Sequence, residues 1–217
     1  GIDTAVKTAS EAIDKLNSTA MSHHRVMIVE VMGRDAGWIA LESGIATGSD
    51  VIILPEIPYD INSVCKKVSE RSRKGHRFSI IVVAEGARPK DGERVIKRMV
   101  KDSPEPVRLG GIGAKLAHDI ETLTQLECRV TVLGHLLRGG TPSAYDRVLA
   151  TRFGLKAAEL CCQGVTGVMV AVRGNAVFAP FVLAARFGRR SPFRGRSLRS
   201  RPRFATSLLL RRHLGAE

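Results

Sequence analysis

An apolar run at residues 26–31 constrains the fold most strongly. It reads Val-Met-Ile-Val-Glu-Val, is rich in β-branched side chains, and is followed directly by Met32, Gly33 and Arg34. A nearly continuous apolar strand is typical of a parallel sheet covered on both faces. Open α/β sheets bind ligands at the carboxyl ends of their strands, where Gly33 permits close backbone approach and Arg34 supplies a cation suited to phosphate. The simpler interpretation is a surface arginine after an ordinary strand.

Helical and strand-like segments alternate along the rest of the chain. Helices are expected at residues 3–20, 35–46, 61–75, 110–124 and 143–163, and further strands at 51–54, 78–84, 129–133 and 168–172. Right-handed crossovers place successive strand ends on the same side of a parallel sheet. The fold class predicted is therefore α/β, with a parallel sheet flanked by helices.

Three stretches of the chain carry more specific expectations. The helix at 35–46 is expected to turn Trp38 and Ile45 toward the core. Residues 87–108 are polar, contain three prolines and are expected to form a surface excursion. Residues 110–113, Gly-Gly-Ile-Gly, look like a phosphate-binding loop, but no apolar strand precedes them, which favours a structural turn.

Two more strands end in residues that carry chemistry. Glu85 follows the strand at 78–84, while His135 and Arg138 follow the strand at 129–133. Together with Arg34, these residues would place three cations and one carboxylate on one rim of the sheet. Such a rim suits a phosphorylated sugar, because cations hold a phosphate and a carboxylate accepts from a hydroxyl. Glu85 could instead simply pair with a basic neighbour.

The formal charge of +13 is unevenly distributed. Residues 178–217 hold 10 Arg, no Lys and one acid, whereas the first 177 residues hold 24 Lys+Arg and 20 Asp+Glu. The four cysteines form no CxxC pair and are interpreted as reduced thiols of a cytoplasmic protein (Cys65, Cys128, Cys161 and Cys162). No apolar run reaches membrane-spanning length, and no metal site is predicted within the chain.

Two segments resemble signature segments of the phosphofructokinases. The first is Val-Glu-Val-Met-Gly-Arg-Asp-Ala-Gly-Trp at residues 29–38, and the second is Leu-Gly-His-Leu-Leu-Arg-Gly-Gly-Thr-Pro-Ser-Ala-Tyr-Asp-Arg at 133–147. Residues 35–38 and 57–60 look more like the bacterial branch that includes pyrophosphate-dependent members. The resemblance covers about residues 1–177 and implies the Rossmann-like fold of that family.

The resemblance also implies a 6-phosphofructokinase of glycolysis. Such an enzyme transfers a phosphoryl group, with Mg²⁺, from ATP or pyrophosphate to the 1-hydroxyl of fructose 6-phosphate. By motif match, the implied substrate-binding residues are Arg25, Met32, Gly33, Arg34, Glu85, Arg129, His135 and Arg138. Arg34 would steady the migrating phosphoryl group, while Arg25 and Arg129 would reach a neighbouring subunit's site in a homodimer or homotetramer.

The donor loop, the catalytic aspartate and the Mg²⁺ ligands of the family precede the first helix, so an N-terminal donor-binding part is expected to be missing. The chain is then expected to be inactive alone. Residues 1–177 are expected to be the fructose 6-phosphate-binding part, and 178–217 a tail that is disordered or the product of a frameshift. The alternative is a non-catalytic sugar-phosphate protein, or a nucleic-acid-binding protein that uses the basic tail, although that tail lacks a repeated basic pattern.

Overall fold

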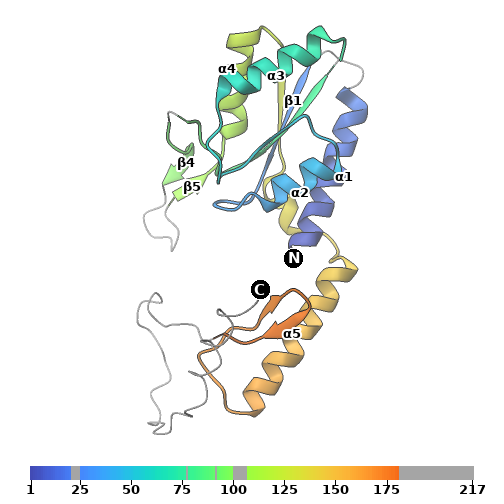
Figure 1. The fold of residues 1–217 in the computed structure, drawn as a ribbon, viewed down its shortest axis with the longest axis vertical. Helices are drawn as coiled ribbons and strands as arrows, with labels where there is room; N and C mark the ends of the chain where they lie inside the picture. The colour runs from blue at the N-terminus through green and yellow to red at the C-terminus, as the bar shows by residue number, and fades with distance from the viewer. Residues whose placement is uncertain (21–24, 77, 91, 100–106, 181–217) are drawn as a thin grey trace, which may run out of the picture. The chain divides into compact units, whose positions relative to one another are not determined.

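The structure is a computed structural model that describes residues 1–20, 25–76, 78–90, 92–99 and 107–180 (Figure 1). The chain divides into two compact units, Gly1–Ala157 and Ala158–Glu217. The first unit holds the sheet and the candidate site. Most of the predicted tail, residues 181–217, lies outside the described residues, as do His23 and His24.

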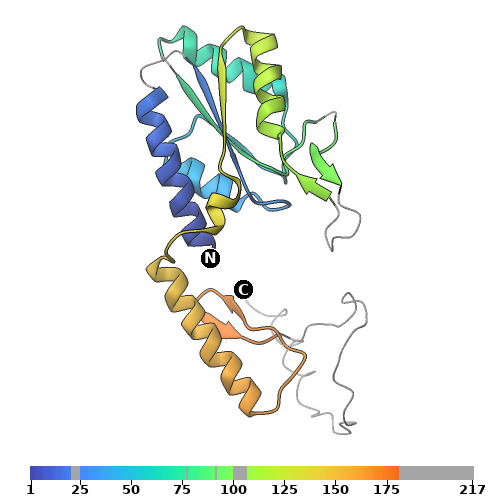
Figure 2. The same cartoon turned by 180° about the vertical axis from the view of Figure 1, so that it is seen from behind.

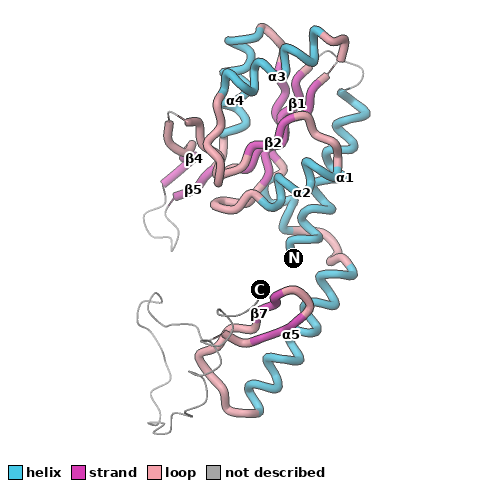
Figure 3. The backbone as a smooth tube through the Cα atoms, in the orientation of Figure 1, coloured by secondary structure: helices cyan, strands magenta, loops and turns pink. Residues whose placement is uncertain are grey.

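The first unit is built on a four-stranded parallel sheet with the order β2-β3-β1-β6. Figure 3 marks β1 and β2 among the strands of the first unit. Val26 of β1 pairs with Ser79 of β3 on one side and with Cys128 of β6 on the other. The α/β fold predicted from the apolar runs is therefore confirmed. The strands are β1 (Val26–Val31), β2 (Val51–Ile53), β3 (Ser79–Ala84) and β6 (Cys128–Val132).

Helices cover both faces of this sheet, which explains why every residue of β1 and β3 is buried. On one face lie α1 (Ile2–Ala20) and α2 (Trp38–Ala46); on the other lie α3 (Ile61–Arg73) and α4 (Ile112–Thr124) (Figures 1 and 2).

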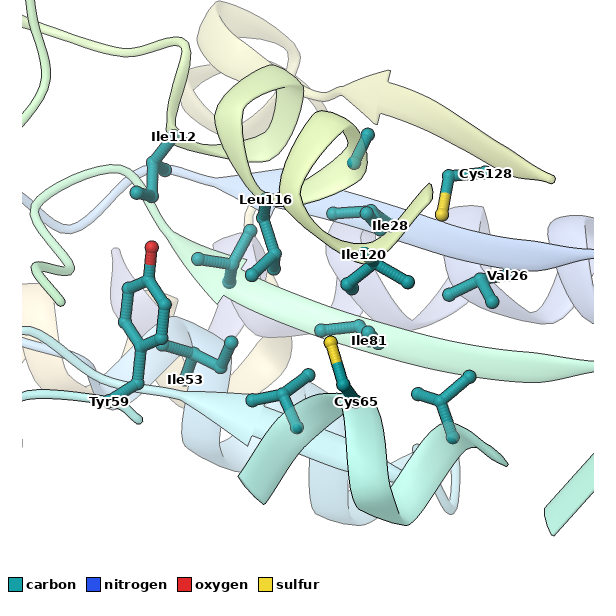
Figure 4. Close-up of a cluster of buried hydrophobic side chains, with 14 of the residues drawn as sticks. Val26, Ile28, Ile53, Tyr59, Cys65, Ile81, Ile112, Leu116, Ile120 and Cys128 are labelled. Atoms are coloured by element: carbon teal, nitrogen blue, oxygen red, sulfur yellow. The ribbon is translucent and has the colours of Figure 1, made fainter. Parts of the chain in front are cut away.

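Successive strand residues point to opposite faces and so build two separate cores. Val26 and Ile28 join the core under α3 and α4, whereas Met27 and Val29 join the core under α1 and α2. Figure 4 shows the first of these cores, where Leu116 and Ile120 of α4 pack on the sheet.

Helix α2 differs from its prediction in two respects. It begins at Trp38 instead of residue 35, and its Trp38 and Ile45 side chains are 57% and 66% exposed. The buried residues of α2 are small ones, Ala40, Ser43 and Gly44. A Cβ on Gly44 would lie 2.7 Å from Ile52, so close packing on the second strand selects this small face over the large apolar one.

Three shorter pieces complete the described chain. The polar excursion contains an antiparallel hairpin of β4 (Ile96–Met99) and β5 (Val107–Leu109), which sequence patterning missed. A 3₁₀ turn η1 (Gly134–Arg138) follows β6, and α5 (Ala144–Cys162) follows it. In the second unit, β7 (Ala171–Arg173) pairs antiparallel with β8 (Ala176–Phe178). The strand predicted at 168–172 thus starts later and joins this hairpin, not the parallel sheet.

The cysteines and the helices add two observations. All four cysteines are free thiols, with Cys65 and Cys128 buried and Cys161 and Cys162 exposed. Among the residues that the structure describes, no helix combines the length and the apolar character needed to cross a membrane.

Candidate functional site

The carboxyl ends of β1, β3 and β6 meet at one edge of the sheet, called here the carboxyl edge. The backbone N–H of Glu85 donates to the carbonyl of Val31 at 2.9 Å, and that of Leu133 donates to the carbonyl of Glu30 at 3.0 Å. These bonds extend the strand pairing one step beyond the strands. As predicted, they bring the segments that follow the three strands to a common rim.

Glu85 is the residue that ties this rim together. Its Oε1 accepts from the backbone N–H groups of Gly33, at 3.4 Å, and of Arg34, at 3.2 Å. The carboxylate is half-buried, and no described residue donates to its Oε2. The prediction that Glu85 and the Gly33–Arg34 turn lie together is therefore confirmed, and one carboxylate oxygen is left for a further donor.

The turn at Arg34 is strained and tightly packed. Arg34 has a φ of 49°, which is uncommon for a residue with a side chain. A Cβ on Gly86 would lie only 1.6 Å from the carbonyl oxygen of Arg34. The loop after β3 can therefore lie against this turn only because residue 86 is glycine.

The Arg34 guanidinium takes part in a small charge cluster at this edge. Its Nε lies 3.7 Å from the Asp35 carboxylate, which also pairs with Arg94. Asp35 is 62% exposed at its side chain, so solvent screens these pairs. The cluster keeps the Arg34 side chain near the rim. Because its ion pair with Asp35 is weak, an anion that binds arginine more strongly can replace Asp35 as its partner.

The η1 turn carries the two other predicted residues. Leu137 is buried under α1, whereas His135 and Arg138 are exposed. A cavity of about 570 Å³ lies between η1, the start of α1 and the turn after β1, and its lining includes Met32, Gly33 and Arg138. Trp38 also lines it, which accounts for the exposed indole. Arg34, Glu85 and His135 are not among the residues that line this cavity.

Arg25 and Arg129 lie elsewhere, toward the amino ends of β1 and β6. Both pair with one carboxylate, that of Glu127; the Arg25 Nε atom is 2.6 Å from Glu127 Oε2. Within one chain they are therefore not brought to the carboxyl edge with the other predicted site residues.

Glu30 is a buried residue that the sequence interpretation passed over. It is 3% exposed, and its Oε1 and Oε2 accept from the backbone N–H groups of Gly111 at 3.1 Å and Gly113 at 2.8 Å. The glycine-rich start of α4 thus holds an anion that the chain itself provides. The prediction of a structural turn at residues 110–113 is confirmed. The sequence feature that could have identified Glu30 as its partner was an acidic residue within an otherwise apolar strand.

The described residues do not fit a resident Mg²⁺ ion. Among them, no group of three or more His, Cys, Asp or Glu side chains is arranged to hold a metal. The carboxyl edge offers backbone N–H groups, arginines and one bonded carboxylate, which suit an anion better than a divalent cation.

Comparison with known proteins places the chain in a family. Residues 1–161 match the family model described as Phosphofructokinase. The chain is 60% identical to an ATP-dependent 6-phosphofructokinase 2 of Clostridium perfringens over 82% of this chain and 49% of that protein. It is 56% identical to a pyrophosphate–fructose 6-phosphate 1-phosphotransferase of Streptomyces coelicolor over 81% of this chain and 51% of that protein.

Solved structures show the same likeness. The phosphofructokinase from Saccharomyces cerevisiae superposes with a TM-score of 0.69 at 35% identity, covering 82% of this chain and 22% of that chain. A pyrophosphate-dependent phosphofructokinase from Marinobacter aquaeolei gives a TM-score of 0.64 at 25% identity, covering 82% and 45%. The chain spans about half the length of the curated relatives it matches. With its family model matched from the first residue to beyond η1, this chain belongs to the phosphofructokinase family.

Proposed function

We propose that this chain carries the acceptor-binding part of a glycolytic 6-phosphofructokinase, which phosphorylates the 1-hydroxyl of fructose 6-phosphate. The names of the two curated relatives above support this substrate. They name ATP in one case and pyrophosphate in the other, so either donor remains part of the proposal. The activity belongs to the whole enzyme, of which these residues correspond to about half.

The observation that carries the proposal is the Glu85 carboxylate, which bonds the Gly33–Arg34 turn through Oε1 alone. In the proposed complex Oε2 accepts from a sugar hydroxyl. Met32 and Gly33 line the sugar site, and Arg34 steadies the migrating phosphoryl group. Phosphoryl transfer depends on positioning and charge neutralisation, which a cationic rim of this kind supplies.

The 6-phosphate is assigned to η1. Arg138 lines the cavity of about 570 Å³, and His135 lies three residues earlier on the same exposed turn. An arginine can hold a phosphate with two parallel N–H···O bonds. Gly139 and Gly140 follow Arg138 and have no side chain that would block a phosphate group from reaching it.

Arg25 and Arg129 are assigned to the site of a second copy. Their shared Glu127 pair lies at the amino ends of the strands, away from Glu85 and Arg138. Within one chain they cannot serve its own carboxyl edge, so the proposed enzyme is a homodimer or homotetramer with sites completed across an interface. The cytoplasmic location, the Mg²⁺ requirement and the inactivity of the chain alone stay predictions.

Isothermal titration calorimetry of the 217-residue chain with fructose 6-phosphate tests the proposal. We expect saturable binding that Arg138→Ala weakens at least about 10-fold, because a charge-assisted phosphate contact is lost. Arg73→Ala is the matched control: Arg73 is exposed at the far end of α3, outside both the carboxyl edge and the cavity. Binding that Arg138→Ala leaves unchanged, or equal weakening by both variants, would contradict the assignment.

A further inference from the structure

Arg94 reaches the carboxyl edge from outside the two signature segments. It lies between the loop after β3 and the start of β4, in the polar excursion to which the sequence assigned no function. Its Nη1 donates to Asp35 Oδ1, 59 residues away in the chain. Asp35 directly follows Arg34, the residue assigned above to the migrating phosphoryl group. The excursion therefore acts on the turn after β1 through this carboxylate.

The two oxygens of the Asp35 carboxylate face two different guanidinium groups. Oδ1 accepts a hydrogen bond from Arg94, whereas Oδ2 lies 3.7 Å from the Nε of Arg34. A distance of 3.7 Å is too long for a hydrogen bond, so the contact with Arg34 is electrostatic only. Two arginines thus compete for one carboxylate, and Arg94 has the stronger hold on it.

The backbone of the turn is fixed independently of this competition. Glu85 Oε1 accepts from the Arg34 N–H at 3.2 Å, and the loop at Gly86 packs directly against the Arg34 carbonyl. The side chains of Arg34, Asp35 and Arg94 are 41%, 62% and 38% exposed, so they have room to change partners. Loss of Arg94 would therefore rearrange side chains and leave the turn itself in place.

The rearrangement has a defined direction. Without Arg94, both oxygens of Asp35 are available to Arg34, and a carboxylate can hold a guanidinium through two parallel hydrogen bonds. Such a pair would neutralise the cation, and a phosphate group would have to displace the carboxylate before it could bind. In the structure, Arg94 keeps the contact between Arg34 and Asp35 long and weak.

We propose that Arg94 is a positioning residue of the phosphoryl site: it holds Asp35 so that the Arg34 guanidinium can turn to a phosphate at the 1-position of the sugar. This inference rests on the proposed function, which assigns Arg34 to that phosphate. Arg94 acts through Asp35 and requires no contact with the sugar. It adds to the site a residue that neither signature segment contains.

Calorimetric titration of the 217-residue chain with fructose 6-phosphate and fructose 1,6-bisphosphate tests the inference. Only the bisphosphate carries a phosphate at the 1-position. We expect Arg94→Ala to weaken the bisphosphate about 3- to 5-fold, the range that an exposed ion pair gives, and fructose 6-phosphate less than about 2-fold. Arg94→Lys should retain most of the bisphosphate affinity, because an ammonium group can also pair with Asp35.

A second substitution shows whether Arg94 acts through Asp35. In the Arg94→Ala background, Asp35→Asn removes the competing charge and should restore bisphosphate affinity to the wild-type value. Glu93→Gln in the same background is the matched control, because it neutralises an exposed acid beside residue 94 and leaves Asp35 charged. It should restore little of the loss. A loss that Asp35→Asn does not reverse, or that Glu93→Gln reverses equally well, would overturn the proposal.

The reactivity of Arg34 toward phenylglyoxal gives a readout that requires no sugar. The reagent attacks the neutral guanidine, so a tight carboxylate pair, which favours the charged form, slows the reaction. Peptide mass spectrometry should show slower modification of Arg34 in Arg94→Ala and a wild-type rate in Arg94→Ala/Asp35→Asn. An unchanged rate in Arg94→Ala would overturn the proposal. If the wild-type chain bound neither sugar phosphate, the proposed function would fail, while these rates would still decide whether Arg94 controls the Arg34–Asp35 pair.

Discussion

Glu30 and Gly113 form a link between the central strand and α4: the buried carboxylate of β1 accepts a 2.8 Å hydrogen bond from the Gly113 N–H. A Cβ on Gly113 would lie 2.9 Å from Val130 and 3.1 Å from the same carboxylate. The glycine is therefore required for α4 to approach the sheet this closely. What resembles a phosphate loop in sequence holds a carboxylate in the structure.

The first prediction concerns this carboxylate. Glu30→Gln keeps the side-chain shape but turns an amide N–H₂ toward a backbone donor, leaving one buried N–H unpaired. We expect the free energy of unfolding to fall by about 1–3 kcal/mol. Urea unfolding of the two proteins measures it. Glu42→Gln, at an exposed position of α2, should leave the midpoint unchanged, and an equal shift in both variants would contradict this role for Glu30.

The second prediction concerns Gly86. Gly86→Ala places a Cβ 1.6 Å from the Arg34 carbonyl oxygen, so the turn or the loop must move. We expect a loss of about 1–3 kcal/mol in the free energy of unfolding and weaker fructose 6-phosphate binding. The matched control is Gly154→Ala in α5, where a Cβ meets no atom within 4 Å and better helix propensity should add about 0.5–1 kcal/mol. Equal stability of the two variants would contradict the prediction.

The third prediction concerns acid stability. Hydrogen bonds from the Thr4 hydroxyl, the largest cause, and from the Thr4 N–H help to lower the pKa of Asp146 from 3.8 to about 2. Because the folded pKa is the lower one, the stabilisation is complete above pH 4 and is lost as the pH falls toward 2.

Urea midpoints at pH 5 and pH 2 check that expectation. The wild-type chain should be more stable than Asp146→Asn at pH 5, and the difference should shrink at pH 2. Asp14→Asn, on the exposed side of α1, is the control and should show the same small difference at both pH values. If the difference in urea midpoint between wild type and Asp146→Asn did not change with pH, the carboxylate charge would not be what Thr4 stabilises.

The fourth prediction concerns sites shared between copies. Arg129→Ala and Arg138→Ala should each weaken fructose 6-phosphate binding at least about 10-fold if the two arginines act on one site from different chains. Co-refolding the two variants in equal amounts should then restore wild-type affinity at about a quarter of the sites in a two-fold symmetric dimer. Calorimetric stoichiometry measures that fraction. No recovery in a confirmed mixed dimer would place both arginines in the same chain's site.

Much of this architecture follows from burial alone. Apart from Glu30 and Ser79, residues 26–31 and 79–84 are apolar because helices cover both faces of the sheet, so the strands and their parallel arrangement were predictable. Glu85 could be placed beside the Gly33–Arg34 turn because parallel strands end at the same edge.

The features that could not be predicted from sequence depend on contacts with residues distant in the chain. Trp38 was expected in the core, but the small residues of α2 pack on Ile52 and leave the indole to line a cavity. The two strands of the β4–β5 hairpin are four and three residues long, too short for a periodic pattern to stand out from the polar residues around them. The shared pairing of Arg25 and Arg129 depends on Glu127, which no motif singles out.

The strand order has a consequence for synthesis on the ribosome. Among the four strands of the sheet that the structure describes, β1 precedes both of its partners, β3 and β6, in the chain. The pairing of β1 with β3 therefore cannot form until Ser79–Ala84 has left the exit tunnel, and its pairing with β6 cannot form until Cys128–Val132 follows. The rim that follows these three strands can thus be complete only after Arg138 has emerged, because Arg34, Glu85 and Arg138 are synthesised at different stages of translation.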